Sequence, residues 1–328
     1  MRIVVLAGGI GGARFLLGVR AYAREVGAEV TAVVNVGDDL WLHGLKICPD
    51  LDSVMYTLGG GADPERGWGR VGESWTVKEE LAAYGAEPTW FGLGDKDIAT
   101  HLVRSTMLNG GYPLSAVTEA LATRWGPGVR LLPATDDRLE THAVVSGAGE
   151  PGSGAGATED DQGQRAIHFQ EWWVRYRANI PTHRFVFVGA ETAKPAPGAL
   201  DAIGAADLVL IAPSNPVVSV APVLAVPGIR EAVADGPAPV VGVSPIIGGA
   251  PVRGMADRCL AVLGVECSAA GVGRLYGGRP AGGLLDGWLV AEEDADTLVP
   301  EVTVRAVPLR MTDEAATAAM VRAAVELT

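Results

Sequence analysis

Residues 1–19 read MRIVVLAGGIGGARFLLGV, and this stretch decides the expected fold. Residues 3–6 form a short, continuous apolar run, which is typical of a strand buried on both faces of a parallel sheet. Residues 15–25 carry apolar side chains at helical spacing, and residues 30–35 form a second strand-like run. A strand, a helix and a strand in this order predict a βαβ unit with a right-handed crossover.

Four glycines, Gly8, Gly9, Gly11 and Gly12, separate the first strand from the helix. Because glycine adds no side chain to a packed core, we interpret them as a loop whose backbone approaches a phosphate at a helix N-terminus. Arg14 then adds a guanidinium, or is a solvated helix residue. The alternative is a tight turn with incidental glycines. No Lys-Ser/Thr pair follows, so this is not a P-loop, and the match to the dinucleotide fingerprint is loose.

Further apolar runs alternate with helical stretches along the rest of the chain. We therefore expect an α/β fold with a doubly wound, mostly parallel, Rossmann-like sheet. The additional strands are expected at 89–91, 130–132, 208–211 and 239–242.

The chain is expected to form a single α/β domain over residues 1–328. A helical insertion is expected at about 51–85, and a protruding β-hairpin at about 140–178. The Gly-rich, acidic segment 148–166 has almost no large apolar side chain, so we expect it to be the mobile tip of that hairpin.

Composition narrows the class of protein. A net charge of -13 argues against a nucleic-acid-binding surface, which needs clustered Lys and Arg. The three cysteines have no metal-site or disulfide spacing, which favours a reducing compartment. The N-terminal pattern is not that of a signal peptide, and no apolar run reaches the ~18 residues of a membrane span. We expect a cytoplasmic protein without membrane or nucleic-acid partners.

Acidic residues gather after the second predicted strand. Asp38 and Asp39 follow that strand, and Asp50 and Asp52 precede a predicted helix. Carboxylate oxygens are ligands for hard cations, so we take Asp39, Asp50 and Asp52 as candidate metal ligands. Two alternatives stay open. Asp50 or Asp52 is a helix N-cap, or a strand-end aspartate meets a ribose hydroxyl, as in a dehydrogenase.

Three more polar turns follow predicted strands. Asp95 and Lys96 belong to the cluster GLGDKD, whose alternative is a helix cap beside an exposed lysine. Ser214 and Asn215 lie in APSNP, and Ser244 and Gly248 lie in SPIIGG. Proline preorganises such loops, and neutral hydroxyl and amide groups suit a base or a phosphate. Together with the glycine loop they predict a nucleotide at one edge of the sheet.

These segments occur in the order of a known family. LAGGIGGARFL, NVGDDLWLHGLKICPDLDSVMY, WFGLGDKDIATHLVR, LLPATDDRLETH, HFQEWWVR, IAPSNPVVSV and SPIIGGAPVRG cover most of residues 1–255. In this set the chain resembles the 2-phospho-L-lactate transferase family (CofD/FbiA) of coenzyme F420 biosynthesis. The resemblance implies a Mg2+-dependent homodimer. Its enzymes transfer a phospholactyl or phosphoenolpyruvyl group from a guanosine diphosphate conjugate to the ribityl hydroxyl of the 5-deazaflavin Fo, and GMP is released.

The resemblance also implies roles for individual residues. The expected nucleotide- and substrate-binding set is Gly8, Gly9, Gly11, Gly12, Arg14, Asp38, Asp39, Asp95, Ser214, Asn215, Ser244 and Gly248. Asp50 and Asp52, with Asp39, are expected to hold Mg2+ or the Fo hydroxyl. Lys96 is expected on the Fo side, which makes Asp50, Asp52 and Lys96 the candidate catalytic residues.

At most one of Trp172 and Trp173 is expected to pack near the deazaflavin, since adjacent strand residues face opposite ways. The choice between the two donors stays open. Two rival functions remain: a nucleotide-sugar-binding regulator of a related family, and an NAD-dependent oxidoreductase.

Overall fold

The fold centres on a seven-stranded sheet in which every neighbouring pair is parallel. The structure, a computed structural model, describes residues 1–147 and 163–328. The strand order is β14-β13-β10-β9-β1-β2-β5. The strands are β1 (Arg2–Ala7), β2 (Glu29–Val34), β5 (Arg130–Pro133), β9 (Leu208–Ile211), β10 (Val240–Val243), β13 (Gly287–Val290) and β14 (Thr303–Ala306). The predicted α/β class is confirmed.

The central strands lie in the middle of the sheet because their sequences are continuously apolar. Every residue of β9, β10 and β13 is buried. Such strands have no polar face for water, so they are stable only with helices covering both sides of the sheet.

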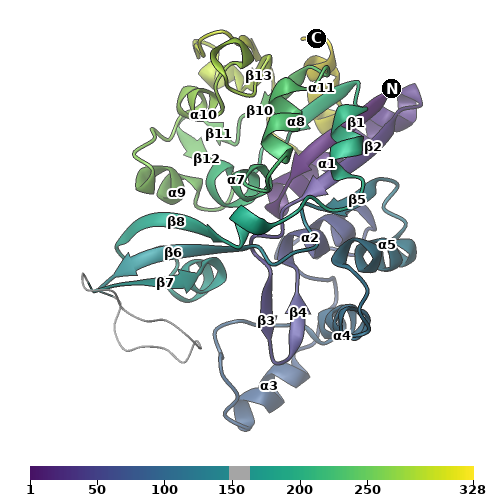
Figure 1. The fold of residues 1–328 in the computed structure, drawn as a ribbon, viewed down its shortest axis with the longest axis vertical. Helices are drawn as coiled ribbons and strands as arrows, with labels where there is room; N and C mark the ends of the chain where they lie inside the picture. Colours follow the sequence, from purple (N-terminus) through teal and green to yellow (C-terminus); the bar gives the residue numbers. More distant parts are fainter. Residues whose placement is uncertain (148–162) are drawn as a thin grey trace.

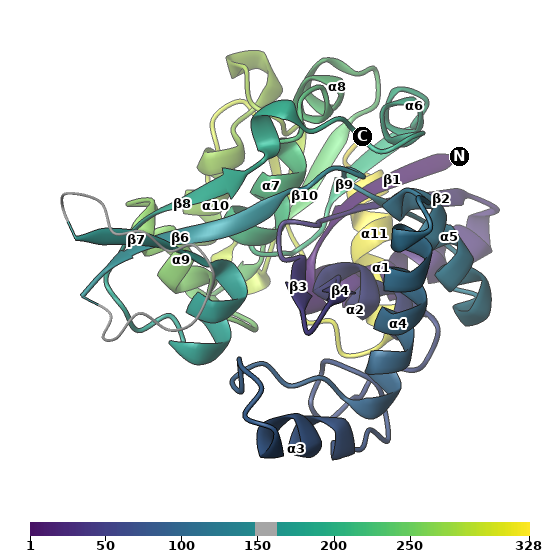
Figure 2. The ribbon, with the colours of Figure 1, turned by 60° about the horizontal axis from the view of Figure 1, so that its bottom comes forward.

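Helices cover both faces because the strand order runs in opposite directions from the centre. β1 leads to β2 on one side, and β9 leads to β10 on the other. Right-handed crossovers then place α1 (Gly9–Val26) and α8 (Ile229–Asp235) on opposite faces. Figure 2 shows this separation, with α6 (Ala199–Gly204) packed on α8 and α11 (Glu314–Val325) packed on α1.

The remaining helices connect the strands or flank the sheet. They are α2 (Pro49–Leu58), α3 (Thr76–Ala83), α4 (Asp95–Asn109), α5 (Leu114–Trp125), α7 (Ala221–Leu224), α9 (Ala256–Val262) and α10 (Ala269–Tyr276). Among the residues placed by the structure, no single helix is long and apolar enough to cross a membrane. Only the bent pair Pro216–Leu224 and Ile229–Asp235 passes that test, by length and composition.

Smaller sheets lie beside the main one. β6 (Glu140–Ser146) pairs antiparallel with β7 (Gln164–His168) and with β8 (Thr182–Val188). A short hairpin joins β3 (Leu40–Leu42) and β4 (Leu45–Ile47). In Figure 1 these elements and α3 lie on the side of the main sheet away from the two termini.

The predicted hairpin is therefore present as β6 and β7, with β8 as a third strand that the sequence did not indicate. Residues 148–162 of its predicted tip lie outside the described residues. The predicted helical insertion at 51–85 contains most of α2 and all of α3.

Three local predictions are wrong, and two strands were missed. The first helix begins at Gly9 rather than at residue 15, because the glycines adopt its first turn. Residues 89–91 are not a strand, since Pro88 and two nearby glycines leave too short an apolar run to pair. Residues 171–175 form the π-helical turn η1 (Glu171–Arg175) instead of continuing β7. β13 and β14 were not predicted.

Candidate functional site

A cavity of about 500 Å3 opens at the carboxyl ends of β1 and β9. These strands are adjacent, but their connections leave in opposite directions, which is where open α/β sheets bind ligands. The start of α1, the loops after β2, β9 and β10, and the turn η1 all contribute to its wall. Polar and aromatic lining residues include Gly8, Gly9, Gly11, Arg14, Asp38, Asp50, Trp68, Phe169, Gln170, Trp173, Ser214, Asn215, Ser244 and Arg253.

The glycines allow the start of α1 to pack tightly beside this cavity. A Cβ on Gly11 would lie 2.6 Å from the carbonyl oxygen of Pro213, and one on Gly8 would lie 2.7 Å from an Asp50 carboxylate oxygen. Gly9 has a φ of +62°, a conformation that favours glycine. The premise that packing does not call for these glycines is therefore wrong, because a side chain at Gly8 or Gly11 meets protein atoms.

The helix start still offers an anion site. The first N–H groups of an α-helix have no intrahelical partner, and Gly9 and Gly11 line the cavity. Arg14 lies on the same helix, is exposed and also lines the cavity. Backbone donors, the positive end of the helix dipole and a guanidinium thus face one space.

Two buried carboxylates, Asp38 and Asp50, lie on the cavity wall and interact with each other. Asn35 links them, since its Nδ2 donates to Asp50 Oδ2 at 2.8 Å and to Asp38 Oδ1 at 3.2 Å. Burial raises the pKa of Asp50 to about 6. Burial and then the charge of Asp50 raise the pKa of Asp38 well above its usual range. Among the described contacts neither carboxylate is paired with a cationic side chain, so the pair favours a proton or a bound cation.

This pair fits a hard divalent cation. Magnesium prefers oxygen ligands and one or two protein carboxylates. A cation between Asp38 and Asp50 would offset both the burial of their charges and their mutual repulsion. The predicted metal set shares Asp50 with this pair. It contains Asp39 and Asp52 but not Asp38.

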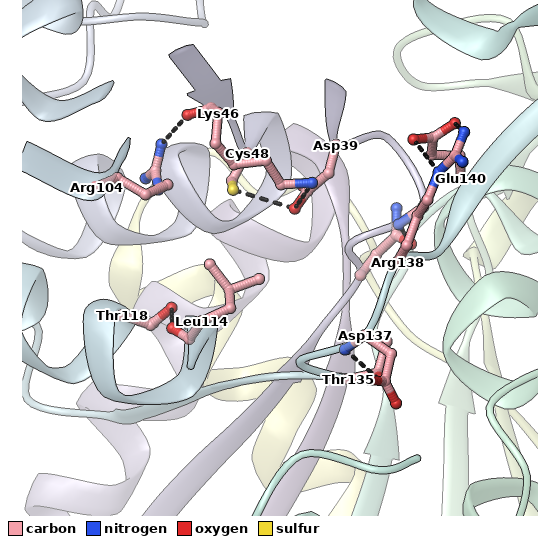
Figure 3. Close-up of polar contacts among 12 residues, drawn as sticks. Asp39, Lys46, Cys48, Arg104, Leu114, Thr118, Thr135, Asp137, Arg138 and Glu140 are labelled. Atoms are coloured by element: carbon pink, nitrogen blue, oxygen red, sulfur yellow. Dashed lines mark hydrogen bonds and ion pairs between the residues drawn. The ribbon is translucent and has the colours of Figure 1, made fainter. Parts of the chain in front are cut away.

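Asp39 makes a separate contact with Lys46 and Cys48 (Figure 3). Its Oδ2 lies 3.3 Å from Lys46 Nζ and accepts a hydrogen bond from Cys48 Sγ at 3.1 Å. Burial raises the pKa of Asp39, although the Lys46 charge opposes that shift. The ion pair gives Asp39 a structural partner, so its predicted metal role has no support from the cavity wall.

Asp52 enters a buried network on the other side of α2. Arg104 donates to both of its carboxylate oxygens, and Arg104 Nη1 also lies 3.0 Å from His101 Nδ1. Asp52, Asp97 and His101 bring metal-type ligand atoms within 4.8 Å of one another. However, the Arg104 guanidinium occupies the Asp52 oxygens, so the network is charge-compensated by protein.

Asp95 and Lys96 are held at the start of α4. Asp95 accepts hydrogen bonds from the Ser74 hydroxyl at 2.7 Å and from two N–H groups at the start of α3. Lys96 Nζ donates to the Val71 carbonyl at 2.9 Å. Neither belongs to the lining of the cavity as far as the chain is described. The lysine is exposed as the alternative expected, but no side chain caps α4, and Asp95 instead bonds the start of α3.

The two proline-containing loops support the cavity by internal hydrogen bonds. The Ser214 hydroxyl donates to the Gly8 carbonyl at 2.7 Å, and Asn215 Oδ1 caps the π-helical turn η3 (Pro216–Val220). The Ser244 hydroxyl donates to the Ile246 carbonyl at 2.8 Å. Gly248 forms the turn between β11 (Ile246–Ile247) and β12 (Ala250–Pro251) and lies outside the described lining. Gly12 likewise packs against Ser214.

The side chains of Trp172 and Trp173 lie in different surroundings, but not for the reason expected from the sequence. Trp172 is buried in the core and donates to the Thr182 hydroxyl at 2.7 Å, whereas Trp173 lines the cavity. They separate because η1 is a helical turn, from which adjacent side chains project in different directions.

Sequence reasoning missed Asn35, Gln170, Trp68 and Arg253. Asn35 lies three residues before Asp38, and a strand-end amide so near to carboxylates was an available signal. The others come from segments whose approach to the cavity no local pattern indicates.

Comparisons with known proteins find relatives over nearly the whole chain. A sequence profile of the family described as "2-phospho-L-lactate transferase CofD" matches residues 3–326. A protein of Nocardia farcinica named phosphoenolpyruvate transferase is 63% identical, over 99% of this chain and 94% of that protein. One of the same name from Mycolicibacterium smegmatis is 60% identical, over 100% of this chain and 98% of that protein.

Solved structures support the fold alone. A crystal structure of a UPF0052-family protein from Bacillus halodurans has a TM-score of 0.60 at 18% identity, and the match covers 99% of both chains.

Proposed function

The chain belongs to the 2-phospho-L-lactate transferase (CofD) family, and from that premise we propose that it transfers a phosphoenolpyruvyl group to Fo. The donor is the guanosine diphosphate conjugate of phosphoenolpyruvate, and the acceptor is the ribityl hydroxyl of Fo. The product is the dehydro form of the first F420 intermediate. The names of the full-length relatives favour phosphoenolpyruvyl over the phospholactyl group.

One observation carries the proposal. A single cavity joins the start of α1, Arg14 and the carboxylate pair Asp38 and Asp50. Phosphoryl-type transfer needs positioning and charge stabilisation more than covalent catalysis. An anion-binding helix start beside a carboxylate pair that holds a cation supplies both requirements.

The donor's phosphates bind at the start of α1. The Gly9 N–H already bonds the Asp50 carboxylate, so the N–H groups of Ile10 and Gly11 face the phosphates. Arg14 adds a charge-assisted hydrogen bond. Ser214 keeps this backbone in place through its bond to Gly8. The loop carrying Ser244 forms the neighbouring wall for the guanosine.

Asp38 and Asp50 hold Mg2+. When bound, the ion stabilises negative charge on the phosphate oxygens and on the departing GMP. One bond forms and one bond breaks at the phosphorus distal from guanosine. The acceptor oxygen forms a bond to the phosphorus distal from guanosine, the bond from that phosphorus to the bridging oxygen breaks, and GMP leaves with its electron pair. The hydroxyl proton passes to solvent, and the carboxylates orient the hydroxyl.

Fo binds at the aromatic end of the cavity, where Phe169 and Trp173 supply flat apolar surface. We further propose that the enzyme works as a homodimer in the cytoplasm, as the family resemblance implies.

Mass spectrometry of the reaction product tests the function. Purified protein is incubated with Fo, Mg2+ and either the phosphoenolpyruvyl or the phospholactyl conjugate of GDP. The expected result is a product with the phosphoenolpyruvyl group and stoichiometric GMP. A product formed only from the phospholactyl conjugate would show that this conjugate is the donor. No product from either conjugate would refute the transferase proposal.

A further inference from the structure

Gln170 is buried on the cavity wall and is outside the set of residues that the sequence predicted. It is 8% exposed and lies between Phe169 and the turn η1. Its Nε2 donates to Asp38 Oδ2 at 3.1 Å. A buried side chain from residue 170 therefore contacts a carboxylate from residue 38 at the site proposed for the cation.

Asp38 depends on Gln170 because the other amide near it, Asn35, is shared among several acceptors. Asn35 Nδ2 carries two hydrogens but faces three acceptors: Asp38 Oδ1 at 3.2 Å, Asp50 Oδ2 at 2.8 Å and the Val218 carbonyl at 3.2 Å. Asn35 therefore cannot serve all three well. Gln170 is the side-chain donor aimed at the other oxygen of Asp38.

The backbone around Gln170 is fixed to the same strand end. Its N–H donates to His168 Nδ1 at 3.1 Å, and His168 Nε2 lies 3.1 Å from the Asp39 carbonyl oxygen. Two separate links thus join residues 168–170 to residues 38–39. These links hold the Gln170 side chain in its contact with Asp38.

The neighbours of Gln170 form the aromatic wall. Phe169 packs on Trp173 with ring centroids 5.8 Å apart, and both line the cavity. One short segment therefore carries the wall proposed for the acceptor ring and the amide that orients Asp38.

We propose that Gln170 is a positioning residue that orients Asp38 for the divalent cation and ties the aromatic wall to the cation site. This inference rests on the proposed function. Hydrogen-bond partners of metal ligands fix ligand orientation, and their loss typically costs about 10–100-fold in metal affinity or activity.

Binding of Mn2+, a spectroscopic substitute for Mg2+, tests the proposal without catalysis. Titration followed by electron paramagnetic resonance compares the wild type with Gln170→Met, which keeps length and loses the donor. We expect about tenfold weaker Mn2+ binding in this variant. In turnover with Mg2+, kcat should fall and the half-saturating Mg2+ concentration should rise. At saturating Mg2+ the donor KM should change less than twofold, because the donor phosphates also bind at α1.

Glu171→Met provides the matched control. It places the same side chain one residue along, and removes only the ion pair with Arg175 on that turn. Its Mn2+ affinity should equal that of the wild type. Gln170→Asn serves as a second variant if Gln170→Met does not fold, since it keeps the amide but is too short to reach Asp38.

The outcomes separate the two proposals. Equal Mn2+ affinity in the wild type and in the folded Gln170 variant, or no Mn2+ binding by the wild type, would overturn the role of Gln170. Mn2+ binding that depends on Gln170 in a protein that makes no product from Fo would support this role and refute the proposed function.

Discussion

Asp50 and Asp52 lie two positions apart on α2, yet their carboxylates have opposite surroundings. Asp50 is buried beside Asp38 with amide donors and no paired cation among its described contacts. Asp52 is buried in contact with Arg104 on both oxygens. A helix turns about 100° per residue, so positions i and i+2 point to different sides. One carboxylate is available for a ligand, and the other is neutralised by the protein.

Replacement of Asp50 should stabilise the metal-free protein. Burial raises the pKa of Asp50 to about 6, from about 3.9 in an unfolded chain. Its contribution to stability is present below pH 4 and is lost as the pH rises through about 6. Asp50→Asn should therefore unfold with a free energy about 2–3 kcal/mol higher than the wild type at pH 7.5.

Chemical denaturation without divalent cations measures this difference, and the gain should shrink at pH 4.5. The same variant should lose at least about 100-fold in turnover, since losing even a hydrogen-bond partner of a metal ligand costs about 10–100-fold. A stability difference that is the same at both pH values would contradict this account of Asp50.

Replacement of Asp52 should have the opposite effect on stability. Asp52→Asn leaves the Arg104 charge buried without its partner, which costs about 3–5 kcal/mol. The double variant Asp52→Asn with Arg104→Met should recover a large part of that loss, because no buried charge remains unpaired. Urea unfolding of both proteins checks this, and a double variant no more stable than the single one would rule it out.

Replacement of Arg14 should weaken binding of the donor without affecting binding of Fo. It is exposed at the start of α1 and faces the cavity. A charge-assisted hydrogen bond is worth about 1.5–3 kcal/mol. Arg14→Ala should therefore raise the donor KM by about tenfold or more, with unchanged KM for Fo and unchanged melting temperature. Arg14→Lys should recover part of this affinity, and steady-state kinetics would reveal an equal change in both KM values if the assignment is wrong.

At the scale of elements, the start of α1 and the loop after β9 form one unit. Gly11 lies against Pro213, and Ser214 bonds Gly8 through its hydroxyl. The glycines therefore serve two purposes at once. They admit close packing between α1 and the loop, and they leave the first-turn N–H groups at the cavity.

Gly11→Ala tests that packing. Its Cβ would lie 2.6 Å from a backbone oxygen, which cannot move away as a flexible side chain could. We expect a loss of about 1–3 kcal/mol in unfolding free energy and weaker donor binding. Gly204→Ala is the control, since a Cβ at Gly204 meets nothing within 4 Å. It should be neutral or stabilising by up to about 1 kcal/mol, and equal losses in both variants would contradict the argument.

At the scale of the whole molecule, the cavity is assembled from segments that are far apart in the chain. The start of α1, the strand end at Asp38, the turn η1, and the loops after β9 and β10 meet at one edge of the sheet. Ligands bound there link segments that separate on unfolding. Binding should therefore stabilise the entire fold rather than one loop.

Thermal unfolding with ligands tests this linkage. GDP with Mg2+ at about 100 times its dissociation constant should add about 2.7 kcal/mol, which is several degrees for a chain of this size. NAD+ and a UDP-sugar at the same concentration should add much less. In Asp50→Asn the part of the shift that requires Mg2+ should disappear, and stronger stabilisation by the UDP-sugar would favour the regulator alternative.

Local sequence determined the parallel sheet, the glycine-bearing helix start and the acidic strand end, because these depend on neighbouring residues. The buried runs around β1, β2, β9 and β10 and the order of the motifs were sufficient for the fold class and the family. Even so, the missed strands β13 and β14 show that short apolar runs become identifiable only once they pair.

Tertiary structure alone decided which carboxylates share the cavity. Asp38, Asp39, Asp50 and Asp52 are the same residue type within fifteen positions, so composition and spacing cannot rank them. Their roles diverge because Lys46 and Arg104 reach two of them, while Asn35 and Gln170 reach the cavity-facing pair. Whether a buried charge is compensated depends on neighbours in space, and most of those contacts are made by chain segments that only folding brings together.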